Sequence, residues 1–211
     1  MQPVTEADPG TQPGPATESV RRLGRPRSEA AEQAIIEATL DVFAEQGFEG
    51  VCVELIAARA GVGKATIYRR WPNKEELLLA AFASLKSPLP EPQGVSVRDD
   101  LLAMVEVMCA DKADPRKARR YALLLGEGEK YPRLMARYKE TVVQPRREAM
   151  RAVIRRGVQA GELRADTDVE IAMLSLTGAI LSQEKSEDGT FDGDFAARLV
   201  DGLLLGLSAR S

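Results

Sequence analysis

The sequence of 211 residues contains no histidine and only two cysteines, Cys52 and Cys109. Two cysteines far apart in the chain, without histidine, do not supply the usual Cys/His ligand set of a zinc site. We therefore expect no bound metal. We also expect both cysteines to be reduced, buried thiols, because free cysteine is among the most buried residue types.

Long apolar runs are missing as well. No run approaches the roughly 20 residues that a membrane-spanning helix needs. The N-terminus is rich in proline, glycine and threonine and lacks the apolar core of a signal peptide. We expect residues 1–20 to be a disordered leader, and the protein to be cytoplasmic with no membrane partner.

Catalytic motifs are equally scarce. The sequence has no G-x-S-x-G motif, no glycine-rich phosphate loop and no histidine. We therefore predict no catalytic residues and no cofactor. An enzyme with its active site in a helical body stays open as an alternative. The two cysteines would be its only candidate thiol nucleophiles, so activity screening with their alanine variants would test it.

Helical periodicity is what the sequence does contain. Alanine, leucine, glutamate and arginine are common, and no stretch alternates convincingly with period two, so we predict an all-α fold. The proline-rich segment "KSPLPEPQG" separates an N-terminal domain, 21–86, from a larger C-terminal helical bundle, 87–211. About ten helices are expected: from Ser28 as N-cap to Gly47, over 53–60 and 64–70, from Asn73 as N-cap to about 85, and over 97–111, 115–127, 131–143, 145–160, 168–183 and 194–208.

The basic residues are unevenly spread. The formal net charge is −3, yet the segment from Arg59 to Lys74 holds five cations and no anion, and "RRLGRPR" holds four arginines. The other 20 basic residues are outnumbered by 32 acidic ones. This asymmetry is typical of a local nucleic-acid surface on an otherwise acidic body. A basic helix with a solvated face and a plain disordered basic tail are the simpler alternatives.

The segment around "AGVG" has the helix lengths and the glycine placement of a helix-turn-helix. In that motif the second helix enters the major groove and the first crosses the DNA backbone. Here the second helix would be 64–70, with Ile67 facing inward. The side chains left outward or sideways are Thr66, Tyr68, Arg69 and Arg70. The N-terminal domain is thus predicted to be a three-helix helix-turn-helix domain with a basic arm.

Residues Ile35 to Leu78 resemble the DNA-binding domain of the TetR family of transcriptional regulators. The resemblance rests on "IIEATLDVFAEQGFEG" and "VELIAARAGVGKATIYRRWPNKEELL", and within them on Phe43, Gly47, Phe48, Ile56, Ala57, Ala60, Gly61, Val62, Thr66, Ile67, Tyr68, Trp71, Lys74 and Glu75. It implies sequence-specific binding to a double-stranded DNA operator. The DNA-binding residues that it implies, together with the arginine arm, are Arg21, Arg22, Arg25, Arg27, Lys64, Ala65, Thr66, Tyr68, Arg69, Arg70 and Lys74.

Two positions depart from the pattern of that family. Gly63 stands where a serine or threonine is common, so a cap or phosphate contact near the start of the recognition helix is in doubt. Cys52 stands where a threonine often caps the preceding helix. Because cysteine is a weak acceptor, we expect a poorer cap there, at a local cost of about 1 kcal/mol.

The last two expected helices carry more apolar surface than one face needs. The helix over 194–208 is apolar nearly all round, and Gly202 and Gly206 permit close approach of another helix. We expect both helices to pair with their copies in a homodimer, which the resemblance also implies. Burial within the chain is the simpler alternative. The interface residues would be Val169, Met173, Leu176, Ile180, Leu199, Gly202, Leu203 and Gly206.

The resemblance further implies that the helices over 97–160 enclose a pocket for an unknown small-molecule effector. Candidate pocket residues are Leu101, Val105, Met108, Leu124 and Tyr138, although such residues at helical spacing are more often plain core. The predicted function is a repressor that its effector releases from a palindromic operator. An activator of the same architecture stays open, because the sign of regulation depends on where the operator lies. So does a helical adaptor whose basic head binds an acidic protein.

Overall fold

The computed structural model describes residues 25–186 and 190–208, with side chains from Glu29 onward. These residues form ten α-helices, one π-helical turn and an isolated bridge between Leu163 and Ser208, which confirms the all-α prediction. None of these helices is long and apolar enough to cross a membrane. The elements are α1 (Arg25–Gly50), α2 (Val53–Ala60), α3 (Lys64–Tyr68), α4 (Lys74–Ala83), α5 (Val97–Ala113), α6 (Pro115–Gly128), α7 (Pro132–Tyr138), η1 (Lys139–Val143), α8 (Gln144–Gln159), α9 (Val169–Glu184) and α10 (Phe195–Leu207).

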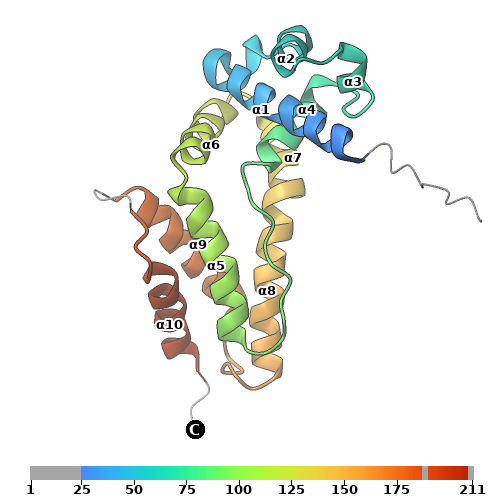
Figure 1. Ribbon diagram of the computed structural model, residues 1–211. Coiled ribbons are helices and arrows are strands. Elements are labelled where there is room, and N and C mark those ends of the chain that lie inside the picture. Colours follow the sequence, from blue (N-terminus) through green and yellow to red (C-terminus); the bar gives the residue numbers. More distant parts are fainter. Residues whose placement is uncertain (1–24, 187–189, 209–211) are drawn as a thin grey trace, which may run out of the picture.

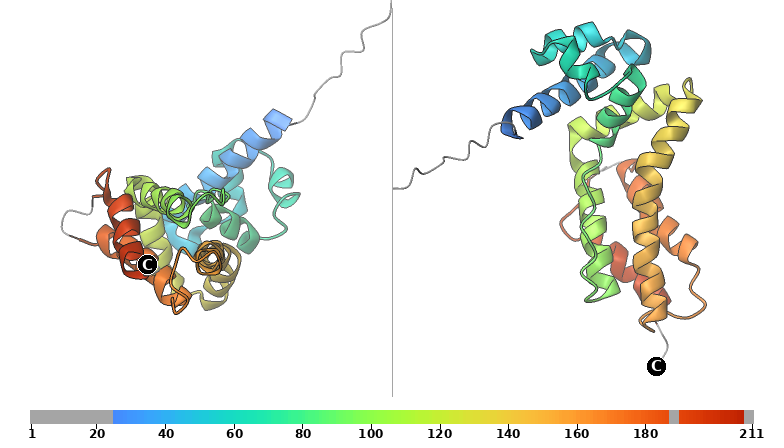
Figure 2. Two further views of the ribbon diagram at one scale, coloured as in Figure 1. Left: turned by 90° about the horizontal axis from the view of Figure 1, so that it is seen from below. Right: turned by 90° about the vertical axis from the view of Figure 1, so that its right-hand side faces the viewer.

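The helices form two groups. Helices α1–α4 gather at one end of the molecule and are called the head here, while α5–α10 with η1 are called the body (Figure 1). In the body, α5, α8, α9 and α10 pack together, and α6 and α7 lie at the end that faces the head (Figures 1 and 2).

Each group has its own apolar core, but the head core is completed by the body. The rings of Phe43, Phe48 and Phe82 meet edge to face in the head, with centroids 4.9 to 5.6 Å apart. Three buried side chains of α6 and α7 join the same cluster: Leu124, Leu134 and Tyr138. A second cluster fills the space between α5, α8, α9 and α10. The head therefore rests on the body through a continuous apolar contact.

Gly47 ends the regular part of α1, as predicted. Its φ of 66° lies in the left-handed region, which glycine adopts without the clash that a Cβ would create. The chain turns at this point, and Phe48 folds back into the head core with 2% of its surface exposed. Phe48 thereby packs in the same core as α1 and α4, and the two short helices α2 and α3 follow this turn.

Several helix boundaries differ from the sequence prediction, and three of the differences have a clear local cause. Helix α1 begins at Arg25 and not after a Ser28 cap, since Pro26, with its fixed φ, suits the first turn of a helix. The recognition helix ends at Tyr68, because the N–H of Arg70 bonds to the carbonyl of Ile67 in a tighter turn. The helix expected over 131–143 is α7 followed by the π-helical η1, a change of winding that apolar spacing does not reveal.

Candidate nucleic-acid interface

The turn between α2 and α3 is built as the sequence predicts. Gly61 follows α2 in a left-handed conformation with φ 66° and ψ 32°, and the N–H of Val62 bonds to the carbonyl of Ala57 at 3.0 Å. Helix α3 then begins at Lys64. Ile67, with 1% of its surface exposed, holds α3 against the head core. The result is a helix-turn-helix with one face of α3 open to solvent.

Trp71 lies on the inner side of this motif. It is 9% exposed and belongs to the head core, so it packs α3 against its neighbours and is not available to stack on bases. Asn73 caps α4, because its side chain accepts a hydrogen bond from the N–H of Glu76 at 2.9 Å. Lys74 therefore stands half-exposed in the first turn of α4.

The outward side of α3 presents the predicted recognition residues unequally. Lys64, Ala65, Tyr68 and Arg69 are exposed, and Thr66 is half-buried. Arg70 is different, because only 16% of its side chain is exposed and it reaches back to Glu32 of α1 and to the carbonyl of Thr66. Of the two arginines that follow α3, Arg69 is therefore the exposed one and Arg70 the half-buried one.

Carboxylates from outside the basic segment pair with two of its cations. Lys64 donates to Glu54 at 3.0 Å, and Arg59 donates to Glu45 at 2.7 Å. These hydrogen bonds lower the pKa of both glutamates. All four groups are solvent-exposed, where such pairs are weak and screened by salt, so a DNA phosphate can replace either carboxylate. The segment 59–74 contains no acidic residue, but in the folded protein two of its cations lie next to carboxylates from other parts of the chain.

The two departures from the family pattern have the local effect expected. Cys52 and Gly63 occupy the N-cap positions of α2 and α3, and neither supplies a side-chain cap. Cys52 is exposed, so the expectation that both cysteines are buried is wrong for it. Its cap position leaves the thiol outside the first turn of α2. Cys109 is buried, and burial raises the pKa of its thiol to about 11.

The predicted arginine arm is largely outside the described residues. Arg21 and Arg22 lie there, as does the predicted leader over 1–20. Arg25 and Arg27 lie in the first turn of α1, at positions whose side chains are likewise outside the description. A role for the arm in DNA binding thus stays a prediction.

The predicted dimer interface divides into inward and outward residues. Met173, Leu176 and Ile180 are 0 to 2% exposed and belong to the body core, so they present almost no surface outside the chain. Val169, Leu199 and Leu203 are half-buried against that core, whereas Gly202 and Gly206 are exposed. The apolar side chains that do face solvent on these two helices are Ile171, Leu174 and Leu181 of α9 and Leu205 of α10.

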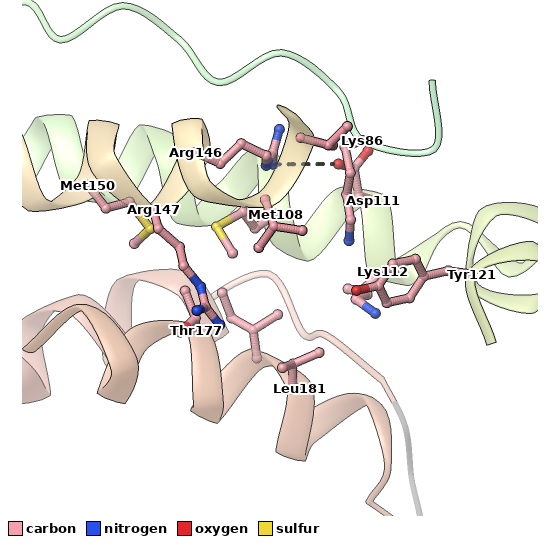
Figure 3. A pocket seen from close by; sticks show the side chains of 13 residues that line it. Lys86, Met108, Asp111, Lys112, Tyr121, Arg146, Arg147, Met150, Thr177 and Leu181 are labelled. Carbon is pink, nitrogen blue, oxygen red and sulfur yellow. Dashed lines mark ion pairs between the residues drawn. The ribbon is translucent and has the colours of Figure 1, made fainter. Parts of the chain in front are cut away.

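A cavity of about 110 Å³ opens in the body between α5, α6, η1, α8 and α9 (Figure 3). Of the five predicted pocket residues only Met108 lines it. Leu101 and Val105 lie in the body core, and Leu124 and Tyr138 lie in the head core. Helical spacing identified these four as inward positions, but it does not show which inward positions border empty space. The side chains that line the cavity are Lys86, Met108, Asp111, Lys112, Tyr121, Val142, Val143, Arg146, Arg147, Met150, Thr177, Ile180 and Leu181.

Among the described residues, no group of three or more histidine, cysteine, aspartate or glutamate side chains is placed to hold a metal ion.

Two families match the chain. Residues 35–81 match the family described as bacterial regulatory proteins, tetR family, and residues 91–203 match the tetracyclin repressor-like, C-terminal domain. The chain is 33% identical over 192 residues to the HTH-type transcriptional regulator YdeS of Bacillus subtilis, covering 90% of this chain and 96% of the relative. It is 30% identical over 183 residues to the DNA-binding transcriptional repressor TetR of Mycobacteroides abscessus, covering 85% and 94%.

Solved structures show the same arrangement. The TetR family transcription regulator SCO0332 is 26% identical, with a TM-score of 0.62 over 83% of this chain and 97% of that one. The transcriptional regulator FadR from Bacillus subtilis, solved in complex with stearoyl-CoA, is 21% identical. Its TM-score is 0.59 over 85% and 99% of the two chains, so this second likeness concerns the fold alone.

Proposed function

Because the chain belongs to the TetR family of helix-turn-helix transcriptional regulators, we propose that it is a homodimeric, cytoplasmic repressor that a small-molecule effector releases from a palindromic operator. The observation that carries the proposal is the outward side of α3, where exposed Lys64, Tyr68 and Arg69 stand on a helix pinned by buried Ile67. A relative named as a repressor favours repression over activation.

On DNA, the residues of α3 divide into reading and positioning. Arg69 reaches a guanine edge in the major groove, where a bidentate arginine gives about 1–3 kcal/mol of discrimination. Lys64, Tyr68 and Lys74 contact phosphates and set the register of the helix without reading sequence. Arg70 keeps α3 in place against α1 through its ion pair with Glu32.

Dimer formation is proposed for the solvent-facing side of α9 and α10. Leu205 has 86% of its surface exposed, and Ile171 has 59%, which is unusual for two large apolar side chains on neighbouring helices. Added side chains at Gly178, Gly202 and Gly206 would meet open space, so a helix of a second copy can approach closely there. A two-fold dimer places two α3 helices on half-sites about 34–36 Å apart or somewhat more.

The proposed link between cavity and head runs through α6. Asp111, in the cavity wall, accepts hydrogen bonds from the N–H of Ser87 at 2.8 Å and from Lys117 of α6 at 2.7 Å. Farther along α6, Arg120 donates to Glu37 and Asp41 of α1. A ligand that moves Asp111 therefore shifts the helix on which the head rests, and ligand affinity and operator affinity become coupled.

Footprinting of the purified protein on genomic DNA from its source, followed by transcript measurement with and without the protein, tests this function. We expect protection of a palindromic site and more transcript of the adjacent gene in the absence of the protein. Less transcript would make the protein an activator. If no site were protected at physiological salt, the assignment of α3 as a reading helix would be wrong.

A further inference from the structure

Two lysine ammonium groups lie against one aromatic ring in the cavity. The Nζ of Lys86 is 3.9 Å from the centre of the Tyr121 ring, and the Nζ of Lys112 is 4.1 Å from it. Only Lys112 has a carboxylate partner, Glu184 of α9, at 2.6 Å. The ring attracts both cations, but a cation–π contact does not neutralise a charge.

Lys86 forms no ion pair with any carboxylate among the described residues. The nearest acidic wall residue, Asp111, is already occupied, because it accepts from Ser87 at 2.6 and 2.8 Å and from Lys117 at 2.7 Å. The Oδ2 of Asp111, which accepts from the Ser87 N–H, also lies 3.9 Å from a guanidinium nitrogen of Arg146. Lys86 is half-buried, so its ammonium stands beside the cavity without the counter-charge that a desolvated cation needs.

A second cation of the cavity also forms no ion pair within the described residues. Arg147 of α8 lines the cavity, and Figure 3 shows it extending toward Thr177 of α9, away from the end where Lys86, Lys112 and Tyr121 gather. Counting Lys117 and Glu184 behind the wall, the part of the chain that the structure describes places five cations around this space and only two carboxylates. The cavity therefore carries an excess of positive charge.

The rest of the wall is apolar. Methionine, valine, isoleucine and leucine side chains from α5, η1, α8 and α9 separate the two charged ends: Met108, Val142, Val143, Met150, Ile180 and Leu181. Methionine is adaptable and polarisable, so it accommodates ring systems and chains of varied shape. An apolar wall with a few convergent charges is the usual character of a small-molecule site.

We propose that the cavity binds an organic anion, with its carboxylate or sulfonate group at Lys86 beside Tyr121 and its apolar part against Met108 and Met150. The proposal rests on the proposed function for the idea that this cavity holds the effector, and it adds the chemical class. A cationic ligand would meet repulsion from Lys86 and Lys112, and a neutral one would leave Lys86 uncompensated.

The position of Lys86 gives the anion a direct route to the head. Lys86 stands three residues beyond the end of α4, and Ser87, next in the chain, is bonded to Asp111 of α5. An anion on Lys86 therefore acts on the segment that joins the last helix of the head to the body.

A pair of fluorescent probes that differ by one charged group tests the ligand class. Anilinonaphthalene sulfonate carries a sulfonate, and phenylnaphthylamine has the same ring system without it. We expect the full-length wild-type protein to bind the sulfonate at least tenfold more tightly, in a saturable manner. Lys86→Met should weaken sulfonate binding about tenfold, because one charge-assisted contact is lost, and should change binding of the neutral probe little.

Two further variants keep the result interpretable. Lys86→Arg retains the charge and should retain most of the sulfonate affinity, whereas Lys139→Met removes an exposed lysine of η1 and should have no effect. Circular dichroism and thermal unfolding confirm that each variant is folded. Equal affinity for the two probes, or sulfonate binding unchanged by Lys86→Met, would overturn the proposal, even if another ligand still released the operator.

The converse outcome separates this inference from the proposed function. If the sulfonate binds through Lys86 but no anion alters operator binding, the anion site stands and the effector role of the cavity fails.

Discussion

Arg120 of α6 donates a hydrogen bond to the carboxylate of Asp41 of α1, so a buried guanidinium of the body holds the head. The same guanidinium donates to Glu37 at 3.0 Å. Burial would raise the pKa of Asp41, but the hydrogen bonds and charge of Arg120 outweigh it and hold that pKa below its usual value. This contact and the apolar cluster of α6 and α7 make head and body one unit.

Replacing Arg120 with methionine should lower the free energy of unfolding by about 1–2 kcal/mol, because two partly buried carboxylates lose the buried one of their two arginine partners. Arg116 is the matched control, since it contacts the same two carboxylates at 3.3 Å while 65% of its side chain is exposed. Arg116→Met should cost less than about 0.5 kcal/mol. Urea unfolding measures both, and equal losses would show that burial of Arg120 does not matter.

Lys86 should make stability depend on pH above neutrality. Burial, with the charges of Lys112 and Arg146, lowers its pKa to about 8, against the weaker opposing effect of Asp111 and Glu184. An unfolded lysine titrates at about 10.4. Between these values the unfolded chain binds more protons, so the free energy of unfolding should rise with pH from about 8 to about 10.

Lys86→Met should abolish that rise and should stabilise the ligand-free protein at pH 7 by about 1 kcal/mol, after allowance for the partial exposure of Lys86. Thermal unfolding at pH 7 and pH 9.5 measures both effects. Lys139→Met should show neither. A variant less stable than wild type at pH 7 would mean that the contact with Tyr121 outweighs the cost of the uncompensated charge.

Leu205→Glu should weaken dimer formation, since it places a charge at the most exposed apolar side chain of α10. Leu125→Glu is the control, because Leu125 is also an exposed leucine, at 45%, but lies on α6 at the end of the body that faces the head. Sedimentation velocity should show a monomer for the first variant and a dimer for the second. Two dimers would place the interface elsewhere.

Local rules made much of the head predictable. A glycine is favoured where the backbone enters the left-handed region, as at Gly47 and Gly61. Asn73 is a typical N-cap residue, because its side chain can accept a hydrogen bond from an N–H only three residues along the chain. Ile67 is the one large aliphatic side chain of its short helix, so its inward direction also follows from the sequence.

The way in which the helices pack against one another was harder to predict from the sequence. Helix α9 is apolar on several sides, so the sequence does not tell which stripe faces the body core; Met173 and Leu176 proved to face inward, and Ile171 outward. Likewise, the pairing of Lys64 with Glu54 depends on how α2 and α3 cross, and the cavity depends on where packing is incomplete. Spacing along one helix carries no information on these relationships between helices.

The most direct measurement of the central claim is the affinity of Arg69→Ala for the footprinted operator and for variants of it with single base-pair changes, by fluorescence anisotropy at two salt concentrations. Arg155→Ala, an exposed arginine of α8, is the control. We expect Arg69→Ala to lose about tenfold or more in affinity and to lose preference at one base pair in each half-site, while Arg155→Ala matches wild type. Unchanged base preference in Arg69→Ala, with binding insensitive to salt, would contradict the account.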